Sequence, residues 1–469
     1  MVPDASRPAG PWQGRVRFAP GGGFAYRPRE VLVRSEVADQ AESVLRNWAE
    51  EETAGKYQPF AIERQERPVA GAFVRFVGDF EPVNAIDRLH SVGILAQVNH
   101  VLFATGCCPP HPSGSMANPF YANPFYANPF YANPFYANPF YANPFYANAN
   151  ACGCGCGGGG AGANPFYANP FYANADPSPF AVPWLQPTGD RRSSARPAEA
   201  PSASAGTAAP GVRIAILDTG WATASYAPDG LPGISAQGDD HPDEGGDGFL
   251  DPAAGHGTFI AGIIERLAPG AHLTVIPVLS GYGDGDESEI ADELWDLAEL
   301  PDAERPQLVN LSFGGYSPQG MGPLAHAVSR LHAEGAAVVA SAGNDATCTP
   351  MYPAVLPAVV GVAALDNEDK AAPFTNYGPW VRACTAGVDV TSIFFKGFNG
   401  AEPPVGGDDP DDFKGWAVWS GTSFAAPRVV AALAQKVAAG TSPHEAVRHL
   451  VDDPALPRKP MLGTVVDPM

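Results

Sequence analysis

The sequence predicts an α/β protein whose main domain is built on a parallel sheet and is preceded by a small α+β domain and a low-complexity linker. Three observations carry this prediction. Residues 211–460 alternate short apolar runs with helical patterns, residues 29–105 follow a β-α-β-β-α-β order, and residues 106–210 are repetitive. The chain has 469 residues, of which 45% are hydrophobic, so both packed domains can bury a core.

The small domain follows a Gly-, Pro- and Arg-rich segment, residues 1–28, that predicts a flexible tail. EVLVRSEV alternates like a strand, and ADQAESVLRNWAEEE places its apolar residues on one face of a helix. FAIERQER and GAFVRFVGDF predict two further strands, EPVNAIDRLHSVG predicts a helix that ends at a glycine, and ILAQVNHVLFA predicts the last strand. The order is that of a small, ferredoxin-like α/β sandwich over residues 29–105.

The linker, residues 106–210, has a composition that excludes it from a packed core. ANPFY occurs six times without a break from Ala117 to Tyr146 and twice more from Ala163 to Tyr172, with ACGCGCGGGGAG between the two blocks. A proline every fifth residue forbids a helix interior and a central strand. Two interpretations stay open: a semi-extended spacer, or an aromatic array that binds a partner.

The main domain contains near-continuous apolar runs, which are typical of strands buried on both faces of a parallel sheet. They are VRIAILD (212–218), LTVIPVL (273–279), LVNLSF (308–313), AAVVASAG (336–343) and VVGVAALD (359–366). Helical patterns such as ESEIADELWDLAEL lie between them and predict crossover connections. Ligands of such sheets bind beyond the carboxyl ends of the strands, so we look for chemistry there.

Three polar residues fall at strand ends or helix starts. Asp218 ends the run AILDTG, His256 begins a helix in GHGTFIAGII, and Ser423 begins a helix in WSGTSFAAP. A serine hydroxyl is a weak nucleophile that needs a base within about 2.6–3.2 Å, and an imidazole steadied by a buried carboxylate can be that base. Taken singly, each residue also fits a structural role: a turn for Asp218, a glycine-flanked helix start for His256 and a capped helix start for Ser423.

The order Asp218, His256, Ser423, with these flanking residues, resembles that of the subtilisin-like serine proteases over roughly residues 211–455. The resemblance implies a subtilisin-like three-layer fold and a serine endopeptidase that cuts polypeptides. Asn344 in VVASAGND matches the position whose amide helps to bind the oxyanion, together with the backbone amide of Ser423. Phe424 stands where many relatives have Met, which changes little because both side chains are bulky and apolar.

The resemblance also implies where a substrate would lie. Ser312, Phe313 and Gly314 in NLSFGG correspond to the segment beside the first specificity pocket, and Gly283, Asp284 and Gly285 in GYGDGDES correspond to the opposite edge. A substrate would then add a strand between the two segments. Asp284 and the acidic surface predict a preference for basic residues before the cut.

The small domain is similar in pattern and position to the inhibitory prodomains of this family, and AQVNHVLFA (96–104) resembles their product-like tail. The resemblance implies a zymogen that binds its own prodomain; the alternative is an unrelated small binding domain. A second hypothesis for the whole chain is a binding or precursor protein whose aromatic repeats are the functional part. In that case the protease domain is vestigial or acts only in cis.

The composition excludes several partners. Lys plus Arg is 28 against 50 for Asp plus Glu, so the net charge is −22, which disfavours nucleic acid and anionic membranes. No run of 18 apolar residues predicts a membrane span, and no secretory signal is visible, so the compartment stays open. We expect a monomer.

Metal and disulfide sites are weakly indicated. HEAVRH (444–449) does not have the spacing of a zinc helix, and we expect no metal or cofactor in the active site. DDHPDEGGDGFLD (239–251) could hold a structural calcium, although a solvated acidic loop fits better. Cys348 follows the segment of Asn344, and Cys384 follows the strand-like run FTNYGPWVRAC, so we predict a disulfide between them.

Overall fold

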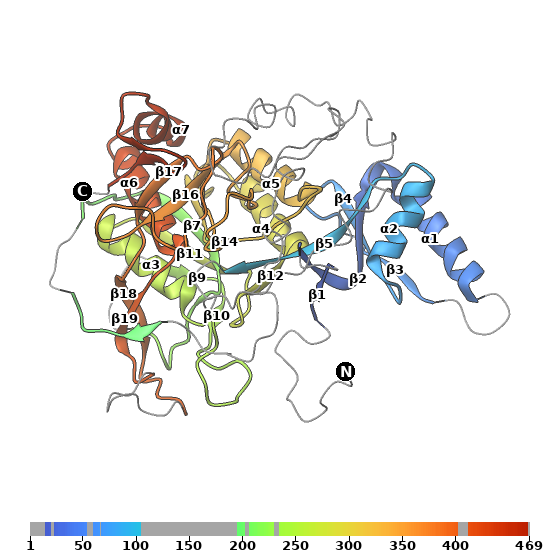
Figure 1. The fold of residues 1–469 in the computed structure, drawn as a ribbon, viewed down its shortest axis with the longest axis horizontal. Coiled ribbons are helices and arrows are strands. Elements are labelled where there is room, and N and C mark those ends of the chain that lie inside the picture. Colours follow the sequence, from blue (N-terminus) through green and yellow to red (C-terminus); the bar gives the residue numbers. More distant parts are fainter. Residues whose placement is uncertain are drawn as a thin grey trace, which may run out of the picture.

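The computed structural model describes residues 15–19, 23–53, 60–65, 67–104, 195–201, 206–228, 234–401 and 411–467. Figure 1 shows a small unit made by the first part of the chain beside a larger unit made by the rest. The ANPFY repeats and the Gly/Cys tract, which we predicted to lie outside a packed core, fall outside the described residues. No helix of the described part of the chain is long and apolar enough to cross a membrane.

The small domain has the predicted β-α-β-β-α-β order. Its elements are β2 (Ala25–Arg34), the 3-10 turn η1 (Ser35–Val37), α1 (Ala38–Thr53), β3 (Ile62–Arg64), β4 (Phe73–Gly78), α2 (Pro82–Ser91) and β5 (Ala96–Ala104). A short strand, β1 (Arg17–Phe18), pairs with the start of β2. The prediction of a flexible tail over residues 1–28 is therefore wrong for β1 and for the first residues of β2, because backbone pairing and the burial of Ala25 and Tyr26 fix them.

The large domain begins with β6 (Arg196–Pro197), which pairs with β19 (Lys414–Trp419). Residues 196–197 belong to the segment that we predicted to be a linker outside the packed domains, so that prediction is wrong at its carboxyl end, where Ala195 and Ala209 are buried. The other strands and helices follow in the order β7 (Arg213–Asp218), β8 (Trp221–Ala222), β9 (Ile234–Ala236), β10 (Asp239–Asp240), α3 (His256–Leu267), β11 (His272–Pro277), β12 (Asp284–Asp286), α4 (Glu287–Glu299), β13 (Leu308–Leu311), β14 (Phe313–Gly314), α5 (Gly322–Ala333), β15 (Ala337–Ser341), β16 (Val359–Leu365), β17 (Ala383–Ala386), β18 (Val390–Lys396), β19, α6 (Thr422–Ala438), α7 (Pro443–Val447), the π-helical turn η8 (Arg448–Asp452), β20 (Arg458–Lys459) and β21 (Gly463–Val465).

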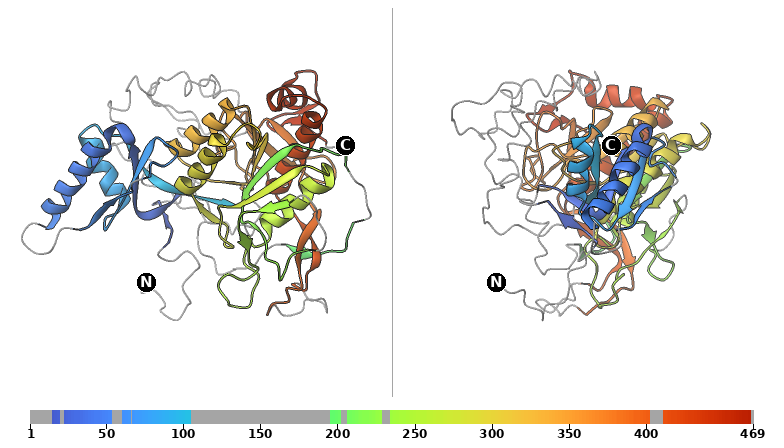
Figure 2. Two further views of the ribbon diagram at one scale, coloured as in Figure 1. Left: turned by 180° about the vertical axis from the view of Figure 1, so that it is seen from behind. Right: turned by 90° about the vertical axis from the view of Figure 1, so that its right-hand side faces the viewer.

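The central sheet of the large domain has nine strands in the order β20-β21-β17-β16-β15-β13-β7-β11-β9. Every neighbouring pair is parallel except β20 with β21, which confirms the predicted parallel sheet. Helices α3 and α6 pack on one face of this sheet, and α4 and α5 pack on the other, which gives three layers (Figure 2).

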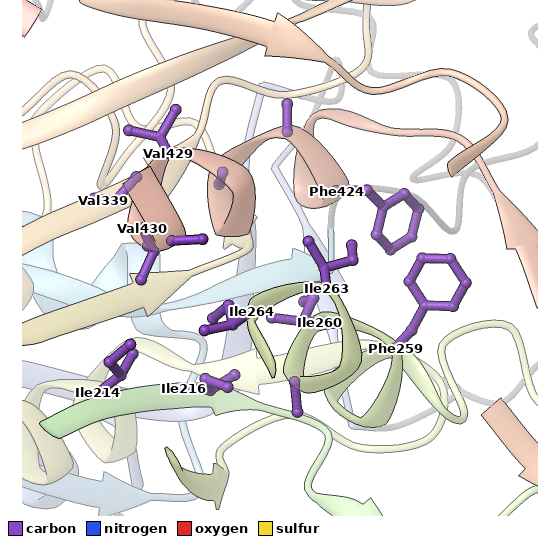
Figure 3. Packing of buried hydrophobic residues seen from close by; sticks show 14 of the residues in the cluster. Ile214, Ile216, Phe259, Ile260, Ile263, Ile264, Val339, Phe424, Val429 and Val430 are labelled. Atoms are coloured by element: carbon purple, nitrogen blue, oxygen red, sulfur yellow. The ribbon is translucent and has the colours of Figure 1, made fainter. Parts of the chain in front are cut away.

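The two faces of strand β7 show how the apolar runs produce these layers. Ile214 and Ile216 join the cluster formed with α3 and α6, where Phe259, Ile260 and Phe424 lie (Figure 3). Ala215 and Leu217, the alternate residues, join the cluster formed with α4 and α5. A strand covered on both faces needs apolar residues at every position, so VRIAIL reads as one continuous apolar run. Each Ile or Leu buried in this way contributes about 1.5–3 kcal/mol.

The last strand of the small domain continues into the large one. β5 pairs antiparallel with β12 and also with β14, so that it lies between two edges of the large domain (Figure 1). The resulting sheet has the order β12-β5-β2-β4-β3. The two domains are thus joined by backbone hydrogen bonds as well as by side chains.

Candidate active site

Asp218, His256 and Ser423 meet at the carboxyl ends of the parallel strands. Asp218 is the last residue of β7, His256 is the first residue of α3, and Ser423 lies in the first turn of α6; all three are fully buried. Nδ1 of His256 lies 2.7 Å from Oδ1 of Asp218, and that oxygen also accepts the backbone N–H of Thr219. The carboxylate therefore orients the ring and fixes the proton on Nδ1.

Two glycines allow α3 to begin this close to β7. Gly255 precedes the helix with φ +80°, and a Cβ there would lie 2.3 Å from the ring of Phe394. A Cβ on Gly257 would lie 2.4 Å from the backbone oxygen of Gly220. Glycine at both positions lets the first turn of α3 approach the end of β7, so the sequence GHG is needed for the Asp218–His256 contact.

Ser423 is held in place by reciprocal hydrogen bonds with Ser312. Its Oγ donates to the backbone oxygen of Ser312 over 3.0 Å, and Oγ of Ser312 donates to the backbone oxygen of Ser423 over 2.9 Å. Nε2 of His256 is buried and makes no hydrogen bond to any residue that the structure describes. The hydroxyl and the base are therefore not hydrogen-bonded to each other here, and a χ1 rotation of Ser423 is needed to bring them together.

Asn344 follows β15 and contacts the residue next to Ser423. Its Oδ1 accepts hydrogen bonds from the backbone N–H and from Oγ1 of Thr422, at 3.0 and 2.9 Å. With the carbonyl end engaged, the amide nitrogen is left to donate. The backbone N–H of Ser423 belongs to the first turn of α6, the end of a helix that attracts negative charge. The two donors are suited to an anionic oxygen.

Aromatic rings enclose the imidazole of His256. The ring of Phe424 lies 5.3 Å away and that of Trp419 lies 5.5 Å away, the latter nearly perpendicular. Phe424 could be noted from the sequence but Trp419 could not, because a tryptophan in the middle strand of a separate three-stranded sheet gives no signal that it reaches the site. The rings exclude water from one side of the base.

A buried carboxylate, Asp240, is hydrogen-bonded to the residues next to Asp218 and His256. One of its oxygens accepts hydrogen bonds from Oγ1 of Thr219 at 2.6 Å and from the backbone N–H of Gly255 at 2.8 Å. Oγ1 of Thr219 in turn accepts the backbone N–H of Gly257 at 3.0 Å. Burial is the main cause that raises the pKa of Asp240 well above its usual value.

The acidic segment 239–251 is not the solvated loop that we predicted, at least at Asp240 and Asp251, which are buried. Burial raises the pKa of Asp251 to about 7, and its Oδ2 accepts the backbone N–H of Glu244 at 2.7 Å. Within the described ranges, no three or more His, Cys, Asp or Glu side chains form a group that could hold a metal ion. A structural calcium at 239–251 stays a prediction.

The two segments predicted to bind substrate lie on either side of β5. In β12, Asp284 is opposite Phe103 and Gly285 is opposite Leu102, while Gly283 accepts the backbone N–H of Ala104 at 2.9 Å. In β14, Phe313 is opposite Ala104 and Gly314 is opposite Phe103. Ser312, which precedes β14, is the residue that Ser423 contacts, so the end of β5 points toward the candidate nucleophile.

The predicted disulfide between Cys348 and Cys384 is wrong, because Cys384 is a thiol. Cys384 lies inside β17 rather than after a strand, and its side chain is buried among Val381, Leu462 and other apolar residues. Trp380, whose Nε1 donates to the backbone oxygen of Cys348, packs against the same cluster. Burial raises the pKa of the Cys384 thiol to about 11.

The sequence is similar to those of a known serine proteinase and of a subtilisin. Over 216 residues the chain is 32% identical to a thermophilic serine proteinase of Bacillus sp. (strain AK1), covering 42% of this chain and 51% of that protein. Over 235 residues it is 32% identical to subtilisin Savinase of Lederbergia lenta, covering 45% of this chain and 79% of that protein. A crystal structure of a lanthipeptide protease matches 55% of this chain and 85% of its own, with 23% identity and a TM-score of 0.44.

The chain thus spans about half the length of the first of these relatives. The model of the subtilase family, Peptidase_S8, matches residues 209–460, which is more than half of the chain and takes in the whole Asp218–His256–Ser423 site. The chain belongs to the subtilase family.

Proposed function

We propose that the chain is a serine endopeptidase in which Ser423 attacks the peptide carbonyl of a polypeptide substrate. The observation that carries the proposal is the buried 2.7 Å contact between Asp218 and His256, with Nε2 of the imidazole available beside the first turn of α6. The names of the relatives, serine proteinase and subtilisin, support the same activity.

The proposed steps begin with a χ1 rotation of Ser423 that moves its Oγ from the backbone oxygen of Ser312 to Nε2 of His256. Nε2 of His256 takes the hydroxyl proton as Oγ of Ser423 bonds to the carbonyl carbon, and Asp218 stabilises the imidazolium that results. The negative charge on the carbonyl oxygen is bound by Nδ2 of Asn344 and the backbone N–H of Ser423. Loss of one such donor lowers turnover on the order of 10²–10³-fold, a magnitude known from subtilisin itself. His256 then returns the proton to the leaving amine, and water hydrolyses the acyl-enzyme in the reverse sequence.

We further propose that the small domain keeps this enzyme inactive as a zymogen. β5 fills the space between β12 and β14, where an extended substrate would pair, and a second strand cannot enter while β5 is there. Polypeptide substrates and the chain's own small domain are therefore the partners that we infer.

Labelling with a fluorophosphonate tests the proposal on the full chain. Once it has processed itself and released the small domain, the native protein should react at a single serine and hydrolyse an unfolded protein substrate, whereas Ser423→Ala should do neither and should keep the fold. Ser420→Ala is the matched control, because Ser420 lies three residues away and its Oγ accepts the backbone N–H of Asp389. A native protein that still resists the reagent after the small domain has been removed would favour the alternative, a binding or precursor protein with a vestigial site.

A further inference from the structure

Two carboxylates lie on the strand edge that borders β5. Asp284 is opposite Phe103, Asp286 is opposite Val101, and Gly285 between them is opposite Leu102. Residues directly opposite each other in an antiparallel pair place their side chains on the same face of the sheet. The two carboxylates therefore share a face with Val101 and Phe103.

The other face is apolar. Leu102, which alternates with Val101 and Phe103, belongs to the buried cluster that contains Leu279 and Ile290. Any extended segment that takes the place of β5 thus meets the two carboxylates, beside the buried Tyr316 and Met351, at the 101 and 103 positions, and hydrocarbon alone at the 102 position.

A guanidinium from the small domain occupies the space between the two carboxylates. Nη2 of Arg27 lies 2.9 Å from Oδ2 of Asp284, and Nε of Arg27 donates to Oδ1 of Asp286. Nη2 of Arg15 lies 3.5 Å from the same oxygen of Asp284. The side chain of Asp284 is fully buried and that of Asp286 is 11% exposed, so both carboxylates need a charged partner.

Every cation that contacts this pair among the described residues comes from residues 15–27. The large domain itself supplies Oγ of Ser280, which donates to Asp284. It also supplies Glu289, whose negative charge adds to the effect of burial in raising the pKa of Asp286. Departure of the small domain would leave two carboxylates on a substrate-binding strand without a compensating charge.

We propose that Asp284 and Asp286 form a subsite for basic side chains of the substrate, at the two alternate positions that Val101 and Phe103 hold in β5. This inference rests on the proposed function. In the zymogen, the guanidinium of Arg27 occupies the subsite that an arginine or lysine of the substrate would fill. The preference lies on the amino-terminal side of the cut, because β5 runs toward Ser312 and Ser423.

The reach of a basic side chain suits this arrangement. Directly opposite Cβ atoms in antiparallel strands are about 4.5–5.5 Å apart and diagonal neighbours about 7–8 Å, both within the span of arginine or lysine. A single guanidinium can pair with two carboxylates through its fork of N–H groups, as Arg27 does. Since the pair is partly open to water once the small domain leaves, we expect a gain of roughly three- to tenfold in kcat/KM for each basic position.

The test is a set of matched peptides cleaved by the full-length protein after it has processed itself. The peptides carry Arg, Gln or Glu at each of the last five positions before the cut. The kcat/KM ratio of Arg to Gln should exceed one at two positions separated by one residue, but not at the position between them, and high salt should lower it. The ratio does not depend on how much enzyme is active.

Asp284→Asn and Asp286→Asn should each reduce the ratio toward one, and Asp284→Lys should favour Glu over Gln. Asp296→Asn is the control, because it removes an equal charge and a contact with Arg67 of the small domain but lies on α4 and away from β12. Cleavage without preference for basic residues in the native protein would refute the inference and leave the proposed function intact. Absence of both cleavage and fluorophosphonate labelling would refute the proposed function as well.

Discussion

His100 and Glu287 are hydrogen-bonded across the contact between the two domains. Nδ1 of His100 in β5 lies 2.7 Å from Oε2 of Glu287 at the start of α4, and their side chains are 3% and 0% exposed. Nε2 of Gln97 donates to the same oxygen at 2.9 Å. The carboxylate of Glu287 is therefore satisfied mainly by residues of the small domain.

Removal of His100 should loosen β5. In a Ser423→Ala background, which prevents self-cleavage, His100→Ala leaves a buried carboxylate short of a partner, and we expect a loss of about 2–4 kcal/mol. Hydrogen exchange of the β5 amides measures this loss as faster opening. His100→Gln, which can still donate, should recover part of it. Unchanged exchange in His100→Ala would show that the contact does not hold the domains together.

Acid should weaken the docking of the small domain through His326. The imidazole of His326 stacks on Trp295 with the ring centroids 5.2 Å apart, and it meets Phe73 of the small domain edge-on. Burial, followed by the charge of Arg34, lowers the pKa of His326, whereas the charge of Glu36 raises it. His326 therefore binds a proton less readily when the small domain is docked than when it has separated. The docking free energy should fall as pH drops below about 6.5, toward the lowered pKa.

The control for this pH dependence is His326→Phe, which keeps an aromatic ring but cannot be protonated. The control is needed because Asp286, whose pKa burial raises to about 6 against the lowering effect of Arg27, titrates in the same pH range. The difference between the native protein and His326→Phe, measured by hydrogen exchange of β5 between pH 5 and 8, isolates the histidine. Parallel pH curves for the two proteins would contradict the prediction.

Gly255→Ala should damage both stability and activity. The substitution puts a Cβ 2.3 Å from the ring of Phe394 at a left-handed position, so we expect a loss of at least about 3 kcal/mol and a displaced His256. Gly440, with φ +95° and nothing near its would-be Cβ, is the matched control. Gly440→Ala should cost about 1 kcal/mol and leave kcat unchanged. Urea unfolding and peptide hydrolysis measure the two effects, and equal behaviour of the variants would argue against the packing role.

Asp240 should act as a positioning residue for the Asp218–His256 pair. Asp240→Ala leaves Oγ1 of Thr219 and the backbone N–H of Gly255 without their acceptor, so kcat should fall about tenfold or more with little change in KM. Asp240→Asn keeps a carbonyl oxygen in the same place and is close to the neutral form that burial favours, so it should retain most activity. If Asp240→Asn lowered kcat as much as Asp240→Ala does, the negative charge of Asp240 would be required instead.

The parts of the fold that repeat a simple physical pattern could be predicted from the sequence. β7 and β15 are covered on two faces and read as unbroken apolar runs, whereas α4 shows one apolar face. Asp218, His256 and Ser423 each stand at the end or the start of such an element, so the sheet brings them to one edge.

Contacts that depend on tertiary placement could not be predicted. Asp240 lies in an acidic stretch whose composition matches that of a solvated loop, and only its position between β7 and α3 buries it. Arg27 lies in a segment that lacks periodicity, and its role appears once β2 is seen beside β5. Nor does the sequence show that Oγ of Ser423 turns to Ser312 instead of His256.

The seating of β5 between β12 and β14 also sets the shape of what can replace it. A segment that replaces β5 must form backbone hydrogen bonds with β12 and with β14 at the same time. It therefore has to be extended over several consecutive residues, with its backbone groups not paired elsewhere. Helices, and strands already held within their own sheets, cannot meet that condition. Chains that are still unfolded, or locally frayed, can meet it, whereas well-folded proteins cannot.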